Sequence, residues 1–186
     1  QKVGEHGANT SRTLKAMEEI LKDRSGGMVK MDLNALLRQD QEMLEKYFEK
    51  EIAKYHISIK FNVPESPLMI NGNAEQLSKT IMSLLGNAVY AVIKKCEKGG
   101  TSPEIALTQT TVGRMAEIHI HDNGTGISEN ILHKIFDPFF TTETTGEASG
   151  VGLYLSKEIA QHHGGDITVQ SEKGVYTEFT ITIPTL

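Results

Sequence analysis

The chain has 186 residues, of which 38% are hydrophobic and 23% charged, and its formal net charge is −5 at pH 7. This length suits one domain of ordinary size, and the acidic balance argues against a nucleic-acid binder, which normally presents a basic patch. The single cysteine, Cys96, excludes an internal disulfide and a cysteine-built metal site, which fits a reducing compartment such as the cytoplasm. No apolar run approaches the ~18 residues of a membrane span, so we expect no direct membrane contact.

The first third of the chain is predicted to be mainly helical. Residues 1–24 carry a loose apolar stripe that ends at Ser25-Gly26-Gly27, which predicts a helix too short to bury its stripe alone. After a short extended piece, Asp32 is placed to cap a helix over about residues 33–55. Alternating apolar residues then predict a strand over 56–63.

A short extended stretch at Leu68–Ile70 leads to the strongest helix signal. Asn73 is a suitable N-cap, and Gln76 follows three residues later as in a capping box, so we predict a helix from Asn73 to about Lys95.

The second half of the chain alternates strands, turns and two helices. Strands at about 104–110 and 115–121 are predicted to form a hairpin around Gly113. After them we predict a short helix at 129–135, a patternless loop at 137–151, a helix at 152–163 and strands at 166–170 and 177–183.

Tight turns join most neighbouring strands. They predict an α/β two-layer sandwich in which a mixed, mostly antiparallel sheet carries helices on one face, preceded by a helical segment. We place the domain boundary so that residues 1–27 form one partial unit and residues 28–186 form the main domain.

The first group of candidate site residues is Asp122-Asn123-Gly124-Thr125-Gly126, directly after a predicted strand. Asp122 shares its strand parity with Ile118 and Ile120, so it is expected to point into the layer between sheet and helices. A lone carboxylate there is costly unless a donor such as the amino group of adenine satisfies it. The alternative is an ordinary polar glycine turn. A dinucleotide-binding motif is excluded, since the third glycine is missing.

The second candidate is Asn87, which lies on the same helix flank as Ser83 and Ala91. Its carbonyl oxygen is a suitable ligand for Mg²⁺, which prefers oxygen ligands and is usually shared with phosphate. The alternative is an ordinary surface asparagine.

The third candidate is the stretch Ala148-Ser149-Gly150-Val151-Gly152-Leu153, which opens a helix. Backbone N–H groups at a glycine-rich helix start attract phosphate, although an ordinary loop-to-helix junction has the same appearance. Before it, residues 136–140 contain three phenylalanines that would anchor the long loop. Long loops of this kind are often lids over binding sites.

The order of these motifs resembles the GHKL superfamily, and within it the catalytic domain of sensor histidine kinases. The resemblance runs from about Asp32 to Pro184. Four segments carry it: residues 84–88 are similar to the N box, 122–127 to the first glycine box, 135–142 to the F box and 149–157 to the second glycine box.

The resemblance implies a role for each matched residue. Asn87 would coordinate Mg²⁺ at the phosphates of ATP, Asp122 would bond the adenine amino group, and Thr177 would support the base through water. Residues 137–151 would form the ATP lid. The remaining residues implied to line the nucleotide are Gly124, Gly126, Ile127, Phe139, Gly150, Val151, Gly152 and Leu153.

The resemblance leaves the reaction open between three alternatives. GHKL ATPases place a general-base glutamate one turn before the Mg²⁺ asparagine, where this chain has Ser83, so transfer to another nucleophile is favoured over hydrolysis. The lid has no cation, with Glu143 where lysine is frequent, and Ala148 and Ser83 also depart from the family. These changes keep open a nucleotide-binding pseudokinase or regulatory module.

The phosphoacceptor is expected to lie outside the chain. His6 lacks the acidic residue and the proline that follow the family's acceptor histidine. Residues 1–24 are more similar to the second helix of the dimerisation hairpin. The implied partners are therefore the phosphoacceptor helices of a homodimeric parent kinase and a response-regulator receiver domain.

Overall fold

The computed structural model describes residues 27–142 and 150–186. The predicted helix at residues 1–24, His6 and the lid positions Glu143 and Ala148 lie outside the described residues, as does nearly all of the predicted unit 1–27.

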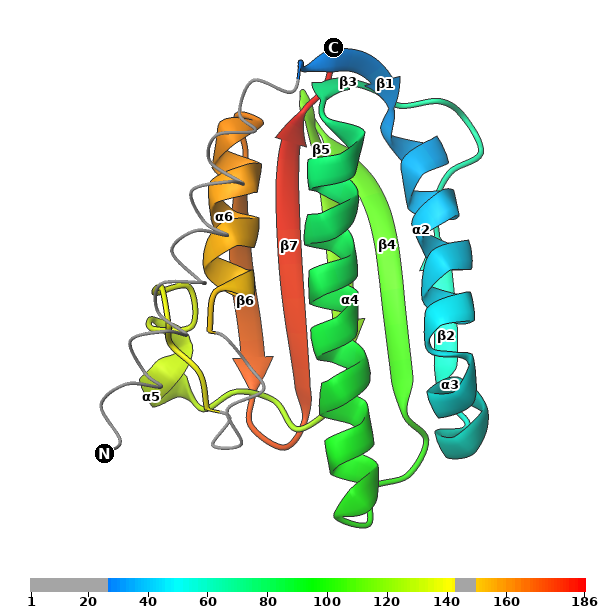
Figure 1. Ribbon diagram of the computed structural model, residues 1–186, viewed down its shortest axis with the longest axis vertical. Coiled ribbons are helices and arrows are strands. Elements are labelled where there is room, and N and C mark those ends of the chain that lie inside the picture. Colours follow the sequence, from blue (N-terminus) through cyan, green and yellow to red (C-terminus); the bar gives the residue numbers. More distant parts are fainter. Residues whose placement is uncertain (1–26, 143–149) are drawn as a thin grey trace, which may run out of the picture.

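A five-stranded sheet forms the centre of the domain, with the strand order β2-β4-β5-β7-β6 (Figure 1). Strands β2 and β4 run parallel, and every other neighbouring pair is antiparallel. The predicted mixed, mostly antiparallel sheet is confirmed. Its strands are β2 (Ser58–Asn62), β4 (Glu104–Val112), β5 (Met115–Asp122), β6 (Asp166–Glu172) and β7 (Tyr176–Pro184).

Two further strands pair with each other at one end of this sheet. β1 (Val29–Asp32) and β3 (Met69–Gly72) form an antiparallel ladder close to the C-terminus, as Figure 1 shows. An isolated bridge between Ile70 and Thr185 joins this ladder to the end of the chain. The predicted extended pieces are therefore one small second sheet.

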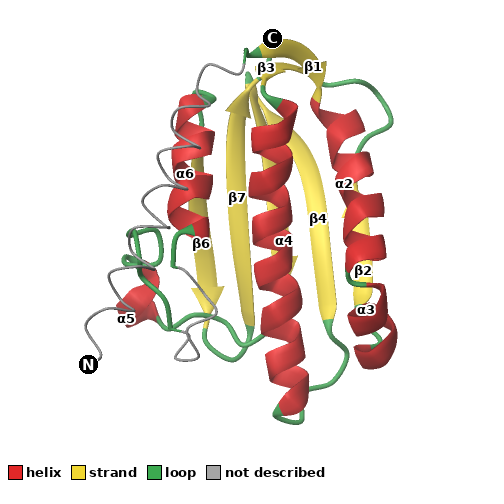
Figure 2. Cartoon of the chain, viewed as in Figure 1, coloured by secondary structure: helices red, strands yellow, loops and turns green. Residues whose placement is uncertain are grey.

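Three helices lie side by side on one face of the sheet, as predicted (Figure 2). They are α2 (Leu33–Tyr47), α4 (Ala74–Glu97) and α6 (Gly152–His162), and two short helices, α3 (Glu49–Tyr55) and α5 (Glu129–Leu132), complete the set in the described part of the chain. None of the helices in residues 27–142 and 150–186 is both long enough and apolar enough to span a bilayer.

The core fills the layer between these helices and the sheet. Alternate residues of β5 point into it, so that Ala116, Ile118 and Ile120 are buried, and Leu77, Ile81, Leu84 and Leu85 of α4 meet them from the helical side. Each fully buried leucine or isoleucine contributes about 1.5–3 kcal/mol relative to an exposed one. The inward parity of β5 extends to Asp122, which fixes where that carboxylate points.

The two longest helices, α2 and α4, begin at the N-cap residues that the sequence predicts. Asp32 Oδ1 accepts hydrogen bonds from Asn34 N and Leu68 N, both at 3.0 Å, and Asn73 Oδ1 accepts one from Gln76 N at 3.0 Å. The bonds from Asn34 N and Gln76 N satisfy N–H groups that have no partner inside the helix, and the bond from Leu68 N ties the segment before β3 to the start of α2.

His163, directly after α6, fastens the end of that helix to the beginning of α4. Its Nε2 accepts a hydrogen bond from Asn73 N at 3.0 Å, and its Nδ1 donates to Ile159 O at 2.7 Å. Burial lowers the pKa of His163 from its usual value, opposed by the bond to Ile159 and aided by the neighbouring His162. The ring is therefore a neutral bridge with both nitrogens in use.

One predicted helix is wrong, because two separate helices take its place. The helix expected over 33–55 ends at Tyr47, and α3 begins afresh after Phe48, whose φ of −104° and ψ of 22° break the α-helical path. The break lets Phe48 and Ile52 pack against the core while the chain turns towards β2. The helix predicted at 129–135 is likewise shorter, with only Glu129–Leu132 α-helical.

Candidate functional site

Helix α4 forms one wall of the candidate site. Ser83, Asn87 and Ala91 are spaced one turn apart on a single flank and so extend over roughly 12 Å of the helix axis. A Cβ on Gly152 would lie 3.2 Å from Ser83 Oγ, and a Cβ on Gly124 would lie 2.6 Å from Ala91 Cβ. The two glycine motifs therefore approach α4 at two levels, with Asn87 between them.

Asp122 closes one end of this site at the last position of β5. The side chain is 3% exposed, and its Oδ1 accepts a hydrogen bond from Gly124 N at 2.8 Å. Burial raises the pKa of Asp122 to about 7, against the opposing effects of the Gly124 hydrogen bond and the charge of Lys95. A buried carboxyl with so little stabilisation of its charge is a typical feature of a ligand site.

The loop after Asp122 is held against the turn between β6 and β7. Gly126 has a φ of +63°, and a Cβ there would lie 2.1 Å from Glu172 O, so only glycine fits. Gly174 N donates to Thr125 O at 2.6 Å, which closes the contact between the loop and the turn.

Thr177 reaches the same end of the site from the neighbouring strand. It is the direct partner of Asp122 in the β5–β7 register and is also buried. Its Oγ1 lies 2.9 Å from Ser171 Oγ, which in turn accepts a hydrogen bond from Ile127 N at 2.8 Å. The structure thus brings together five predicted residues at one end: Asp122, Gly124, Gly126, Ile127 and Thr177.

The other end of the site is the beginning of α6. Gly150 has a φ of +68°, and a Cβ there would lie 2.6 Å from the Phe139 carbonyl carbon, so this glycine abuts the backbone of the phenylalanine segment. Val151 is buried, and Leu153 is half-buried against the core. These two side chains anchor the turn, and the N–H groups of the first turn of α6 have no partner inside the helix.

Phe139 differs from the other predicted residues of this end. Its side chain is 45% exposed and its φ is +68°, an uncommon conformation for a large residue. The Phe139 backbone contacts Gly150, while Phe136 and Phe140 provide the apolar anchorage on the core that the sequence predicts for this segment.

A cavity of about 130 Å³ continues from this end between α4 and α6. Ser83 and Gly152 border it on the side of the site, and Leu155 and Ile159 line it farther along. The space next to the α6 start is therefore open along the cleft between the two helices.

Asn87 lies between the two ends, with an exposed side chain that has no hydrogen bond to the described residues. One carbonyl oxygen suits a Mg²⁺ ion that takes its other ligands from phosphates and water, but it would not suit an ion caged by protein. Within residues 27–142 and 150–186, no group of three or more His, Cys, Asp and Glu could hold a metal. The residues present therefore fit an ion shared with a phosphorylated ligand.

Two residues of the site, Lys95 and Ser171, are not among those predicted. Lys95 Nζ donates to Asn123 O at 2.8 Å, and Asn123 Oδ1 accepts from Glu104 N at 2.8 Å, which fixes the start of the loop after Asp122. Ser171 bonds the end of that loop. The alternation of β6 could have indicated Ser171, because it shares its parity with Ile167 and Val169, which pack on the core.

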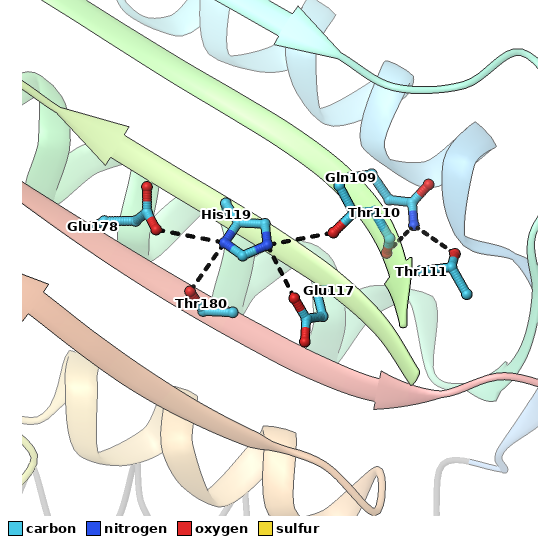
Figure 3. Close-up of polar contacts among 7 residues, drawn as sticks. All are labelled: Gln109, Thr110, Thr111, Glu117, His119, Glu178 and Thr180. Atoms are coloured by element: carbon cyan, nitrogen blue, oxygen red, sulfur yellow. Dashed lines mark hydrogen bonds and ion pairs between the residues drawn. The ribbon is translucent and has the colours of Figure 1, made fainter. Parts of the chain in front are cut away.

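His119 and His121 alternate along β5 with the buried Ile118 and Ile120, so they lie on the opposite, helix-free face of the sheet, where Figure 3 shows His119. His119 Nε2 is 3.2 Å from Glu117 Oε2, whereas Nδ1 is 3.2 Å from Thr180 Oγ1 and 3.5 Å from Glu178 Oε1. The two carboxylates approach opposite sides of the ring and do not converge on one point. This arrangement is a polar surface network rather than a metal site.

Comparison with known proteins agrees with this geometry. The family model "Histidine kinase-, DNA gyrase B-, and HSP90-like ATPase" matches residues 72–186. The signal transduction histidine-protein kinase AtoS of Escherichia coli K12 is 31% identical over 174 residues, which cover 94% of this chain and 27% of AtoS. The two-component sensor PprA of Pseudomonas aeruginosa is 32% identical over 135 residues, or 72% of this chain and 14% of PprA.

A solved structure shows the same fold. The nucleotide-free catalytic domain of the histidine kinase ThkA is 26% identical, with a TM-score of 0.68 over 84% of this chain and 95% of that one. The chain spans well under half the length of AtoS and PprA, so it corresponds to one part of such proteins. Since the family model covers more than half of the residues, this chain belongs to the family of histidine kinase-, DNA gyrase B- and HSP90-like ATPases.

Proposed function

We propose that the chain is the ATP-binding catalytic domain of a two-component sensor histidine kinase. The observation that carries the proposal is the placement of the two glycine motifs at two levels of α4, with the buried Asp122 at one end. Adenine would lie at the Asp122 and Thr177 end, where the Asp122 carboxylate can accept a hydrogen bond from the adenine amino group. The triphosphate would extend towards Gly152, where the N–H groups of the first turn of α6 attract anions.

Asn87 would hold a Mg²⁺ ion between these ends, shared with the phosphates of ATP. The ion would neutralise charge on the γ-phosphoryl group during transfer. The protein contributes position and electrostatics: the α6 N–H groups orient the phosphates, while the Asp122 end fixes the base and hence the direction of the chain of phosphates.

Ser83 favours transfer to an external acceptor over hydrolysis. The residue faces Gly152 at the phosphate end, and a hydroxyl is too weak a base to activate water. We propose that the acceptor is a histidine nitrogen on a dimerisation helix of the parent protein. That nitrogen would bond the γ-phosphorus as the bond to the β-phosphate oxygen breaks and ADP leaves, after which a receiver domain would take the phosphoryl group.

The first test is calorimetric titration of the chain with ATP, with and without Mg²⁺. We expect binding by the wild-type chain, loss of binding in Asp122→Ala, and loss of the Mg²⁺ dependence in Asn87→Ala. Asn71→Ala, on an exposed position of β3, is the matched control for the asparagine change. Absence of ATP binding by the folded wild-type chain would contradict the proposal.

The second test separates a kinase from an ATPase and from a binding module. The chain is mixed with labelled ATP and a dimeric hairpin that contains the phosphoacceptor histidine of a related sensor kinase. Label on the hairpin, and its loss when that histidine is replaced, support the proposal. Steady phosphate release without acceptor would indicate the ATPase, and tight binding without transfer would indicate the pseudokinase.

A further inference from the structure

Ser171, on β6, has a hydroxyl group whose hydrogen-bonding capacity is fully used. Its Oγ donates to Tyr176 O at 2.7 Å, accepts from Ile127 N at 2.8 Å and lies 2.9 Å from Thr177 Oγ1. A serine hydroxyl has one proton and two lone pairs. Three partners are therefore the most that this side chain can serve.

The proton count fixes the direction of the contact with Thr177. Tyr176 O is a carbonyl oxygen and can only accept, so the single proton of Ser171 is committed to it. The Ser171–Thr177 contact then requires a proton from Thr177. The Thr177 hydroxyl consequently points its proton towards Ser171 and away from the base end of the site.

Thr177 in this state can only accept hydrogen bonds from a ligand. Its neighbour across the strand pair is Asp122, whose carboxylate also only accepts when it is ionised. The base end of the site therefore offers acceptors from two adjacent strands. At position 6, a 6-amino purine presents N–H donors to this surface, whereas a 6-oxo purine presents a carbonyl oxygen that meets acceptors and stays unpaired.

We propose that Ser171 is a specificity-determining residue that selects 6-amino over 6-oxo purine nucleotides by orienting the Thr177 hydroxyl. The inference rests on the proposed function, because it assumes that a nucleotide base occupies the Asp122 end. Ser171 does not touch the base itself. It acts through the direction of the Thr177 hydroxyl group at the base end.

Ser171 also ties Ile127 N to β6, and loss of this tie must be separated from loss of selectivity. A loosened loop weakens ATP and inosine triphosphate (ITP) alike, because both nucleotides use the same loop. A changed hydroxyl direction alters the ratio of the two affinities. ITP replaces the 6-amino group of the base by an oxo group, so this ratio is the diagnostic quantity.

The experiment is calorimetric titration of the whole chain with ATP and with ITP at pH 8, at constant Mg²⁺. The variants are Ser171→Ala, Ser171→Thr and Thr177→Val, the double variant Ser171→Ala/Thr177→Val, and Ser58→Ala at an exposed strand position as control. Thermal melts confirm that each variant is folded.

We expect Ser171→Ala to narrow the ATP-to-ITP affinity ratio by about fivefold, the size of one oriented hydrogen bond. Ser171→Thr keeps the hydroxyl and should restore the ratio, and Ser58→Ala should not change it. Thr177→Val should narrow the ratio by itself, and Ser171→Ala should then have no further effect on the ratio.

Two results would overturn the inference. One is an unchanged ratio in Thr177→Val, which decides the matter even if Ser171→Ala does not fold. The other is a Ser171→Ala effect on the ratio that persists in the Thr177→Val background. Failure of the wild-type chain to bind ATP would instead overturn the proposed function, so the two failures are distinguishable.

Discussion

Asp122 and Thr177 lie directly opposite each other on β5 and β7, and both side chains are buried on the helix-covered side of the sheet. The distance between them is set by the strand register, so neither residue depends on a loop for its position. Two polar groups in a buried layer are costly unless they are hydrogen-bonded. The Thr177 hydroxyl is hydrogen-bonded to Ser171 Oγ, whereas burial keeps the pKa of Asp122 raised to about 7. A buried carboxyl group with a raised pKa is typical of a ligand site.

The first prediction concerns the pH dependence of stability without nucleotide. Asp122 has a folded-state pKa of about 7, above its ordinary value of 3.8. Its contribution to stability is therefore complete below pH 3.8 and is lost as the pH rises to about 7. Asp122→Asn removes the cost of burying the charged carboxylate. At pH 8 we therefore expect the free energy of unfolding of the variant to exceed that of the wild type by on the order of 1–3 kcal/mol, with a higher melting temperature.

Thermal melts at pH 5 and pH 8 test this prediction, with Asp137→Asn at an exposed position as control. The stabilisation should be large at pH 8 and small at pH 5. Equal effects at both values would show that the charge of Asp122 is not the cause. The same variant should bind ATP more weakly, since an amide places donors where the base amino group needs an acceptor.

The second prediction compares two glycines with positive φ. Gly126 and Gly113 have φ of +63° and +60°, but a Cβ at Gly126 would lie 2.1 Å from a backbone oxygen, while one at Gly113 would have nothing within 4 Å. Gly113→Ala should cost only the backbone penalty of about 1 kcal/mol. Gly126→Ala must also displace the loop after Asp122, so we expect loss of ATP binding in titrations of that variant alone. Retained affinity in Gly126→Ala would indicate that this loop does not contact the ligand.

The third prediction tests the bridge between α6 and α4. His163→Ala removes both hydrogen bonds of the buried ring and should destabilise the chain by about 2–3 kcal/mol in denaturant titration. His162→Ala, at the exposed neighbouring position, should be close to neutral. The pKa of His163 is lowered, so its contribution is complete above pH 6.5 and is lost as the pH falls through the folded-state pKa. A variant whose deficit against wild type does not shrink at acidic pH would contradict this account.

The fourth prediction concerns Lys95, which lowers the pKa of Asp122 through its charge. Lys95→Met keeps much of the side-chain length but removes the ammonium group, so the pKa of Asp122 should rise further. NMR titration of the Asp122 carboxyl carbon gives the pKa directly. Lys98→Met, at an exposed position three residues later, should leave it unchanged. A fall of the Asp122 pKa in Lys95→Met would refute the assigned electrostatic effect.

Features that are specified by a turn, a helix cap or strand alternation could be predicted from the sequence. The β4–β5 hairpin follows from alternating residues around Gly113, and the α4 start follows from Asn73, whose side chain does cap Gln76 N. The inward direction of Asp122 follows from its parity with Ile118 and Ile120. In each case the sequence signal lies in one short stretch of the chain.

Features that depend on distant contacts could not be predicted in this way. The parallel pairing of β2 with β4 joins segments more than 40 residues apart, and no turn signal specifies it. The break at Phe48 has no glycine or proline to mark it. Asp40 is fully buried between Leu37 and Leu44 and accepts a hydrogen bond from Ser78, a partner that only the packing of α2 on α4 provides.

The His163 bridge fixes the C-terminal end of α6 against the beginning of α4. The 11 residues of α6 span roughly 16 Å, from the glycine that faces the phosphate end to the ring that holds the first residues of α4. The α6 helix therefore cannot slide along α4 without breaking the hydrogen bond between Asn73 N and His163 Nε2. The length of α6 and the fixed position of its C-terminal end together set how far Gly152 lies from the first residues of α4, and thereby the width of the phosphate end.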